Sequence, residues 1–322
     1  MRQLVKLLMA AAAASVLAAC GGGDDHPPQP GTPTAEASAC GFTPLVAAAD
    51  TAGLVPALCS STSSLTVFAP TDGAFTALAT RLGFASTTAL VTSLDGPTLA
   101  KALQHHVLSS KKMASDLAAG GATQATLYNF ESAATTPSLS TTGGFKLIDE
   151  MLTQADVTVA DVPASNGAIH ATDKMLVPPG VPTVVRMAQL NPAFLVLVEA
   201  VIAAKLDTTL SGTDSFTVFA STDTAFMAVS KKLGLSKAQS LAGPDLAGIL
   251  TYHLVADDVG AAAAIALPKP ASVKTAQGSS FSIGNTLAIT DGRGRTASLV
   301  ATDVIATNGL IHVINNGILS TL

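Results

Sequence analysis

The clearest pattern of apolar and polar positions along the chain is a ten-residue stretch that occurs twice. Residues 66–75 read TVFAPTDGAF and residues 217–226 read TVFASTDTAF. Each opens with β-branched and aromatic residues, which favour a strand, and continues into helix-spaced apolar positions. We expect a strand that buries Phe68 or Phe219, then a turn and an amphipathic helix. The copies lie 151 residues apart (217 − 66), a spacing typical of whole domains rather than of short repeats.

The turn between strand and helix holds side chains that are typical of a helix N-terminus. Thr71 or Asp72 can accept a backbone N–H there, and a carboxylate also suits the positive end of the helix dipole. We therefore interpret Asp72 and its counterpart Asp223 as helix caps rather than catalytic acids. The other shared positions of this block are Thr66 and Phe75 in the first copy and Thr217 and Phe226 in the second.

A second matching pair of segments supports the repeat. Residues 101–108 read KALQHHVL and residues 248–255 read GILTYHLV. Their apolar positions recur at i and i+4, so both segments are predicted to be helices. His106 and His253 occupy the same place. A single histidine on an apolar face is usually a core residue with one satisfied hydrogen bond, and we interpret both in this way rather than as metal ligands.

A third pair of segments closes each copy. SNGAIHATDKMLVPP starts at residue 165 and TNGLIHVINNGILST at residue 307, and strand-like alternation precedes each. The Asn-Gly pairs at Asn166 and Asn308 lie between β-patterned runs and tolerate the two positive φ angles of a type I′ turn. Each copy is therefore predicted to end in a β-hairpin. His170 and His312 recur at matching strand positions, with no acidic partner required near them.

Together, the TVFAPTDGAF block, the mid-domain histidine and the NGxIHxxDxxLxPP block resemble the fasciclin domain, in this order and twice. The resemblance covers nearly all of residues 41–322. It implies an α+β fold of two tandem domains, each a bundle of short helices packed with a β-wedge or sandwich of about seven strands. It also implies that the two blocks pair as neighbouring core strands. We place domain 1 at 40–179, a linker at 180–182 and domain 2 at 183–322.

The resemblance also carries a functional expectation. Fasciclin domains are similar to modules of cell-adhesion and extracellular-matrix proteins, and in bacteria they are typically found in secreted proteins or lipoproteins. In animal members the helix around the mid-domain Tyr-His is implicated in adhesion. The second copy keeps Tyr252-His253, whereas the first has His105-His106. The copies have therefore diverged, and they need not bind the same target.

The N-terminus is predicted to be an export signal. Residues 1–19 combine a short basic start with an apolar run too short to span a bilayer. Leu17-Ala18-Ala19-Cys20 resembles the lipobox of bacterial lipoproteins, in which Cys20 is lipidated; ordinary secretion with Cys20 as a free thiol is the alternative. Residues 20–39 are rich in Gly and Pro and are expected to form a disordered tether. We expect an exported protein, anchored by lipid to the bacterial envelope, at the outer membrane, or secreted.

Two further cysteines lie at the start of the first copy. Cys40 and Cys59 flank a helical stretch, and an exported protein meets an oxidising environment. We expect a disulfide between them that stabilises the domain by about 3 kcal/mol in the loop-entropy model. Two buried free thiols are the alternative.

Charge and motifs argue against several function classes. The formal net charge is −5 and the basic residues do not cluster, so nucleic-acid binding has little support. The chain carries no Gly-x-Ser-x-Gly elbow, phosphate-binding loop or zinc-ligand spacing. Residues 292–295, GRGR, are interpreted as a hairpin turn. We expect no catalysis, no cofactor and no bound metal.

The sequence therefore favours a non-enzymatic surface protein that mediates adhesion. Its expected partner is a cell-surface or matrix polymer, either polysaccharide or protein, with membrane contact only through the N-terminal lipid. The alternative is a periplasmic module that binds a small apolar or lipid-like ligand between helices and sheet. A large preformed apolar cavity would favour that alternative, whereas closed cores would favour adhesion.

Overall fold

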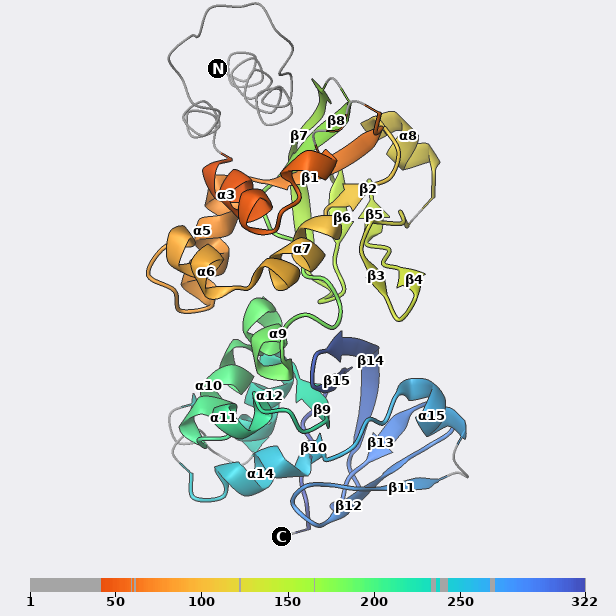
Figure 1. The fold of residues 1–322 in the computed structure, drawn as a ribbon. Coiled ribbons are helices and arrows are strands. Elements are labelled where there is room, and N and C mark those ends of the chain that lie inside the picture. The colour runs from red at the N-terminus through yellow and green to blue at the C-terminus, as the bar shows by residue number, and fades with distance from the viewer. Residues whose placement is uncertain are drawn as a thin grey trace, which may run out of the picture. The chain divides into compact units, whose positions relative to one another are not determined.

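The computed structural model describes residues 42–321 except 59, 61, 122, 165, 233–235, 238–242 and 267–269. The chain divides between Val181 and Pro182 into two compact units, which we describe separately (Figure 1). The predicted signal peptide, the lipidated Cys20, the tether and the Cys40–Cys59 disulfide all lie outside the described residues or depend on residues that do.

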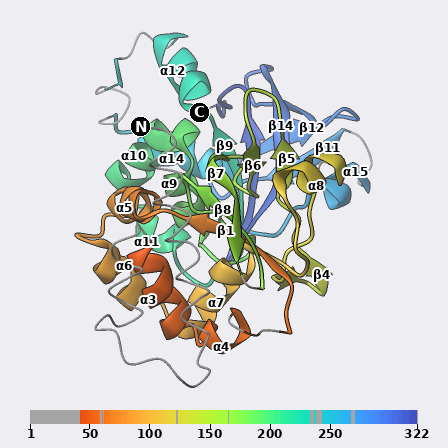
Figure 2. The same cartoon turned by 90° about the horizontal axis from the view of Figure 1, so that it is seen from above.

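The first unit packs short helices against a curled sheet. In Figures 1 and 2, α3, α5 and α6 gather on one side of the central strands, and α8 lies on the other side. Among the described residues, its helices are α3 (Thr43–Thr51), α4 (Val55–Leu58), α5 (Asp72–Arg81), α6 (Thr87–Ser93), α7 (Gly96–Gln104) and α8 (Ala114–Ala119).

The sheet of the first unit has six strands in the order β2-β1-β8-β7-β6-β5, and a separate hairpin pairs β3 with β4. Two isolated bridges, Leu108 with Thr126 and Thr123 with Ser138, lie beside the sheet. The strands are β1 (Leu65–Pro70), β2 (Val107–Leu108), β3 (Asn129–Phe130), β4 (Ala133–Ala134), β5 (Ser138–Ser140), β6 (Lys146–Ile148), β7 (Gln154–Ala164) and β8 (Gly167–Thr172).

The second unit repeats this plan with a seven-stranded sheet in the order β10-β9-β15-β14-β13-β12-β11. Its described helices are α9 (Val184–Leu190), the 3₁₀ turn η1 (Pro192–Phe194), α10 (Leu195–Ala203), α11 (Asp207–Leu210), α12 (Asp223–Lys232), α14 (Leu246–Tyr252) and α15 (Ala261–Ala266). Its strands are β9 (Phe216–Ser221), β10 (Leu254–Val255), β11 (Ala271–Lys274), β12 (Ser280–Ile283), β13 (Ala288–Thr290), β14 (Thr296–Ala306) and β15 (Gly309–Ile314).

No single helix among the described residues is long and apolar enough to cross a bilayer. Helix α9 and the segment Pro192–Ala203 together have the length and composition of a membrane span, but the chain bends by 108° between them.

The centre of each sheet is a parallel pair made by the two predicted motif blocks. In the first unit β1 runs parallel to β8, with Phe68 opposite His170, and in the second β9 runs parallel to β15, with Phe219 opposite His312. The remaining strand pairs are antiparallel. The predicted pairing of the motif blocks as neighbouring core strands is therefore confirmed, as is the α+β fold with sheets of six and seven strands.

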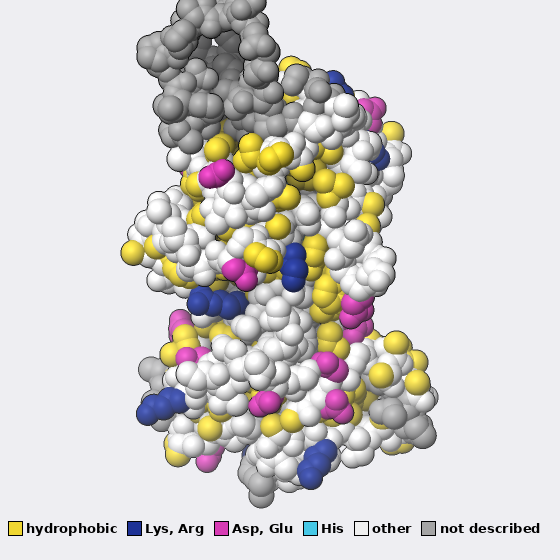
Figure 3. All heavy atoms as spheres, viewed as in Figure 1, with side chains coloured by type: hydrophobic (Ala, Val, Ile, Leu, Met, Phe, Trp, Pro, Cys, Tyr) yellow, Lys and Arg dark blue, Asp and Glu magenta, His cyan; other side chains and the backbone are white. Residues whose placement is uncertain are grey.

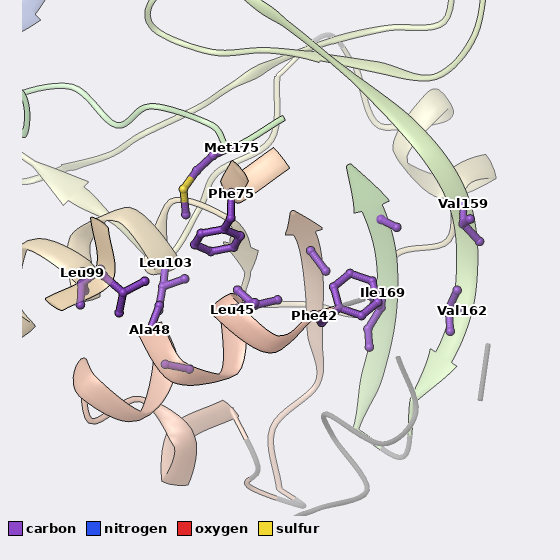
Figure 4. Packing of buried hydrophobic residues seen from close by; sticks show 14 residues of the cluster. Phe42, Leu45, Ala48, Phe75, Leu99, Leu103, Val159, Val162, Ile169 and Met175 are labelled. Carbon is purple, nitrogen blue, oxygen red and sulfur yellow. The ribbon is translucent and has the colours of Figure 1, made fainter. Parts of the chain in front are cut away.

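The core of the first unit lies between the helices and the central strands. Figure 4 shows one buried cluster in which Phe42 just before α3, Leu45 of α3, Phe75 of α5 and Leu103 of α7 pack together with Ile169 of β8. All five side chains are buried. Fully burying a side chain of this size stabilises the fold by about 1.5–3 kcal/mol, so this layer holds the helices on the sheet.

The second unit has a comparable core, with an aromatic pair at its centre. Phe219 of β9 meets Phe281 edge to face, with ring centroids 4.9 Å apart. Both are buried, as expected for Phe219 from the sequence, and Phe68 is equally buried in the first unit.

Two predictions about helices and turns need correction. The segments 101–108 and 248–255 are not helical throughout: α7 ends at Gln104 and α14 at Tyr252, and the chain then forms the short strands β2 and β10. Their apolar residues join the edge of the sheet because β2 pairs with β1, and β10 with β9. Helical spacing on its own could not exclude this outcome, since such short apolar runs suit either element.

The Asn-Gly hairpins are confirmed, but the expected turn type is wrong. Of the described residues at the second turn, Gly309 has a positive φ (137°), whereas Thr307 and Asn308 do not. The glycine is needed for a different reason. A Cβ atom on Gly167 would lie 2.0 Å from the backbone oxygen of Leu65, and one on Gly309 would lie 1.9 Å from that of Phe216. The GRGR hairpin is confirmed by the pairing of β13 with β14.

We predict that Gly167→Ala lowers the free energy of unfolding by about 3 kcal/mol, because the strands β1 and β8 must separate to admit the methyl group. The control is Gly53→Ala, where φ is 66° but no atom lies within 4 Å of the new Cβ. Gly53→Ala should lower the free energy of unfolding only by the strain of a left-handed backbone, about 1–2 kcal/mol. Urea denaturation of both variants tests this, and equal losses would contradict it.

Candidate functional site

The repeated histidines His106 and His253 lie just after a helix, and both of their ring nitrogens are bonded to backbone. Nδ1 of His106 is 2.7 Å from the carbonyl oxygen of Ala102, and Nε2 accepts the N–H of Leu176 at 2.9 Å. In the second domain Nδ1 of His253 is 2.9 Å from the oxygen of Ile249, and Nε2 accepts the N–H of Ile318 at 3.2 Å. Because Nε2 accepts, Nδ1 carries the proton in both rings. Each ring therefore joins a helix to the segment that follows the last strand.

Burial keeps these rings neutral. Desolvation lowers the pKa of His106 to about 4 and that of His253 to about 4. The pKa of His105 falls to about 3, through burial and through the neighbouring His106. The interpretation of His106 and His253 as core histidines is therefore confirmed.

The residue before each of these histidines differs between the copies. His105 places Nδ1 at 2.7 Å from the hydroxyl of Thr135. Tyr252 instead donates its hydroxyl to the carbonyl of Ser280 at 3.0 Å and accepts the N–H of Gly292 at 2.9 Å. Both side chains are fully buried. The Tyr-His pair thus fixes loops inside the domain rather than presenting rings to solvent.

Thr66 and Thr217 join the central strand to the loop after the edge strand. Thr66 Oγ1 donates to the oxygen of Ser110 at 2.7 Å and accepts the N–H of Lys112 at 2.8 Å. Thr217 makes the same two bonds to Asp257 and Val259, at 2.6 and 2.8 Å. A hydroxyl that donates and accepts in this way satisfies two backbone groups at once.

His170 and His312 hold a bulge in the long strand that precedes them. Nδ1 of His170 accepts the N–H of Asp161 at 3.2 Å, and Nδ1 of His312 accepts that of Asp303 at the same distance. Both aspartates have left-handed backbone, with φ of 62° and 57°. The opposite ring nitrogens contact the carbonyl oxygens of Lys112 and Val259. Asp161 lies beside His170 and Asp303 beside His312, but each aspartate contacts the ring through its backbone N–H rather than through its carboxylate.

Asn166 ties the final hairpin to the end of α4 and the loop after it, and Asn308 ties it to the end of α11 and the loop after it. The Asn166 amide donates to the carbonyl oxygens of Leu58 and Ser60 at 2.8 and 3.1 Å. The Asn308 amide donates to those of Leu210 and Gly212 at 2.8 and 2.9 Å. The asparagine therefore recurs because its side chain bonds to backbone about a hundred residues away, not because it favours the turn.

The aspartates of the first motif block cap a helix, but not the one expected. The N-cap of α5 is Thr71, whose hydroxyl accepts the N–H of Ala74 at 3.3 Å. Asp223 instead accepts the N–H of Val196 at 2.8 Å and so caps α10. Desolvation raises the pKa of Asp72, offset in part by a hydrogen bond from the backbone of Thr43 at the start of α3. Each aspartate therefore bonds to the first turn of a helix that precedes it in its own unit.

The sequence analysis missed a second pair of acidic residues, Asp149 and Asp291. Asp149 is buried and accepts the N–H of Val177 at 3.3 Å, and Asp291 accepts that of Leu319 at 2.9 Å. Each precedes its hairpin asparagine by 17 residues (166 − 149 and 308 − 291). That equal spacing is the signal that could have identified the pair.

The two acids differ in their surroundings and therefore in pKa. Desolvation raises the pKa of Asp149, and the charge of Lys174 and hydrogen bonds from Thr153 and Val177 offset only part of this shift. Desolvation also acts on Asp291, but bonds from the backbone of Leu319 and from Arg295 outweigh it and lower its pKa. The guanidinium of Arg295 lies 2.7 Å from the carboxylate.

Taken together, the repeated polar residues form internal braces rather than a reactive centre. Most of their polar atoms are bonded to backbone groups of the same domain, although Oδ1 of Asn166 and Nε2 of His105 are buried without a partner. Within the described ranges, no group of three His, Cys, Asp or Glu residues is placed to hold a metal ion. Phe75 is fully buried and Phe226 partly so, which makes both of them packing residues.

We predict that acid weakens the second domain through His253. The unfolded histidine has a pKa near 6.5 and the folded one near 4, so between these values the unfolded chain binds the extra proton and stability falls as pH falls. The loss between pH 7 and pH 5 is about 2 kcal/mol per histidine. His253→Gln keeps a donor and an acceptor but does not titrate. Urea denaturation should show a smaller pH 7-to-5 loss for the variant; an unchanged loss would refute the assignment.

Several known proteins are similar to parts of this chain. The uncharacterized protein sll1735 of Synechocystis sp. is 38% identical over 138 residues, which are 43% of this chain and 98% of that protein. Transforming growth factor-beta-induced protein ig-h3 of Sus scrofa is 33% identical over 152 residues, 46% of this chain but only 21% of that protein. A solved FAS1 domain pair from the insect cell adhesion molecule Fasciclin I covers 84% of this chain and 93% of its own, at 19% identity and a TM-score of 0.43.

The family model described as "Fasciclin domain" matches the chain twice. The matched regions are residues 40–178 and 192–320, which together make up most of the chain. They contain both parallel strand pairs and both sets of braces described above. The chain therefore belongs to the fasciclin domain family, of which it carries two tandem copies.

Proposed function

We propose that this protein is a non-enzymatic, lipid-anchored surface protein that mediates adhesion to cells, extracellular matrix or exopolysaccharide. Fasciclin domains occur in cell-adhesion proteins, and no enzyme family is indicated for this chain. The observation that carries the proposal is that the repeated polar side chains are bonded to backbone inside each domain. This arrangement builds a rigid scaffold, so binding depends on the side chains displayed around it.

The character of the surface supports a weakly charged partner. Charged residues make up 12% of the chain, and Figure 3 shows Lys and Arg side chains scattered singly over the face drawn. An uncharged or mildly charged polymer, either polysaccharide or protein, fits such a surface. Nucleic acid does not, because binding phosphates requires clustered cations.

The anchor is the second part of the proposal. The lipobox-like Leu17-Ala18-Ala19-Cys20 and the Gly/Pro-rich segment after it support export and attachment by lipid, at the outer membrane of a bacterial envelope. A tethered pair of domains can then reach a polymer at the cell surface.

The alternative, a carrier of a small apolar ligand, has one observation in its favour. The first domain has an open hollow of about 550 Å³ lined by serine and threonine together with Leu54, Leu58 and Leu127. The mainly apolar cavities beside the core are much smaller, about 50 Å³ in the first domain and about 40 Å³ in the second. Pockets for drug-sized ligands typically enclose about 300–1,000 Å³, so the small apolar cavities do not fit such a ligand, whereas the volume of the large hollow does.

We predict that adhesion depends on both domains acting together. A protease site inserted between Gly180 and Val181 lets the same protein be compared before and after cleavage. Two weak sites on one chain gain affinity through effective concentration, so cutting should weaken binding to parent cells or their exopolysaccharide by about 100-fold. The control is the uncut protein treated with inactive protease. Unchanged binding after cleavage would refute the two-site mechanism, and a co-purified small molecule in native mass spectrometry would favour the carrier.

A further inference from the structure

The open hollow of about 550 Å³ in the first domain lies between α4, α7 and the loop that leads into β1. Helices α4 and α7, which border it, are neighbours in Figure 2. We call it the α4–α7 hollow. Its lining mixes aliphatic side chains with hydroxyl and amide groups, and the members that matter here are Leu54, Leu58, Ser63, Gln104, Ser109 and Leu127. A short oligosaccharide is the size of a drug molecule, and pockets for such molecules enclose about 300–1,000 Å³.

The lining of the hollow is uncharged. No Asp, Glu, Lys, Arg or His is among the described residues that line it. A charged ligand would therefore give up hydration there without gaining a charged partner, which is unfavourable. The α4–α7 hollow consequently suits a neutral molecule.

Three polar side chains of the hollow are free to bind a ligand. Among the described residues, the Gln104 amide and the hydroxyls of Ser63 and Ser109 have no hydrogen-bond partner. The amide both donates and accepts, and each hydroxyl can do either, so together they match the hydroxyl groups of a sugar. A purely apolar ligand would cover these groups and leave them unpaired, which is costly.

Aliphatic side chains provide the rest of the surface. Leu127 is 38% exposed, and Leu54 and Leu58 are half-buried. A sugar ring carries C–H groups on its faces, so it can cover aliphatic surface while its hydroxyls reach the amide and the serines. Because none of the described lining residues is aromatic, we expect the binding to be weak.

The strand beside the hollow is not available to an extended peptide. β2 pairs with β1 along one edge. Along the other edge the carbonyl oxygen of Val107 accepts the N–H of Leu127 at 2.8 Å, and Leu108 forms a bridge with Thr126. Peptides that add a strand to a sheet need a free row of backbone groups, so this edge favours a ligand that is recognised by side chains.

The corresponding positions of the second domain do not keep the free groups. Thr251 stands in the place of Gln104, two residues before the mid-domain histidine, and its hydroxyl bonds at 2.8 Å to a carbonyl oxygen of its own helix. Ala256 stands in the place of Ser109 and has no polar side-chain atom. The hollow is therefore a feature of the first copy.

We propose that the α4–α7 hollow binds a short stretch of a neutral polysaccharide. The Gln104 amide and the two serine hydroxyls bond to sugar hydroxyls, and Leu54, Leu58 and Leu127 cover the ring faces. The inference rests on the proposed adhesion function, to which it adds a site and a ligand class. It places the weak saccharide site in the first domain, so the second domain contacts a polymer through a different surface.

A single tryptophan can report on the hollow because the chain contains none. Leu127→Trp in the full chain places the ring at the hollow and adds a surface for a sugar to stack on. Titration with maltotriose, cellotriose, chitotriose and neutral fragments of the parent exopolysaccharide should change its fluorescence saturably. We expect a Kd on the order of 1 mM for at least one of them. Ala276→Trp is the control that should not respond, because Ala276 is also exposed and donates its N–H to the equivalent edge strand.

A second pair of variants tests the hydrogen bonds. Added to the Leu127→Trp chain, Gln104→Leu should weaken saccharide binding at least about fivefold, since it removes the free amide. Thr251→Val in the same chain should leave binding within about twofold, because that hydroxyl is bonded within its helix. Saturation-transfer NMR with the wild-type chain should show the same saccharides bound, which needs no introduced ring.

Several outcomes would overturn the proposal. They are no saturable response at about 20 mM saccharide, full binding by the Gln104→Leu chain, and an equal response of Ala276→Trp. Saturation by 1-octanol alone or by a peptide alone would also overturn it. Adhesion is judged separately: if Gln104→Leu binds parent cells as the wild type does, adhesion stands and the hollow is not its site. Saccharide binding in the hollow without binding to cells would support the site and refute adhesion.

Discussion

The rest of each domain depends on a single constraint, the close parallel pairing of two buried strands. At Gly167 and Gly309 the backbones approach so closely that no side chain fits, and both strands lie between helices and other strands. Nearly all residues of these four strands are buried. The buried backbone groups beside them must find a partner within the protein.

Each of the repeated polar residues hydrogen-bonds to the backbone of a different loop. Thr66 holds the loop after β2, His106 holds the segment after β8, and Asn166 holds the loop after α4. The same three braces recur at Thr217, His253 and Asn308. Hydrogen bonds to buried backbone contribute about 1 kcal/mol each, but leaving the group unpaired costs more, which is why these positions recur while much of the surface differs.

The order of strand, cap and helix and the final hairpins could be predicted from the sequence because they follow from local spacing, whereas the pairing of the motif blocks was expected only from the resemblance to the fasciclin domain. Other features depend on distant residues. The role of Asn166 rests on carbonyl oxygens 108 and 106 residues away, and that of Asp149 on a backbone N–H 28 residues later. The ends of α7 and α14 were misplaced because the edge pairing of β2 and β10 overrides helical spacing. The cap by Asp223 lies on a helix 27 residues earlier, which local capping rules do not reach.

The braces join a side chain to backbone, and backbone is the same whatever residue carries it. A change in a neighbouring side chain therefore does not require a compensating change in the brace. His105 in one copy and Tyr252 in the other illustrate this freedom, as do Thr153 and Arg295 beside the equivalent acids. A scaffold of this kind can be duplicated and its exteriors altered independently, so one chain can acquire two different recognition surfaces without a search for a new fold.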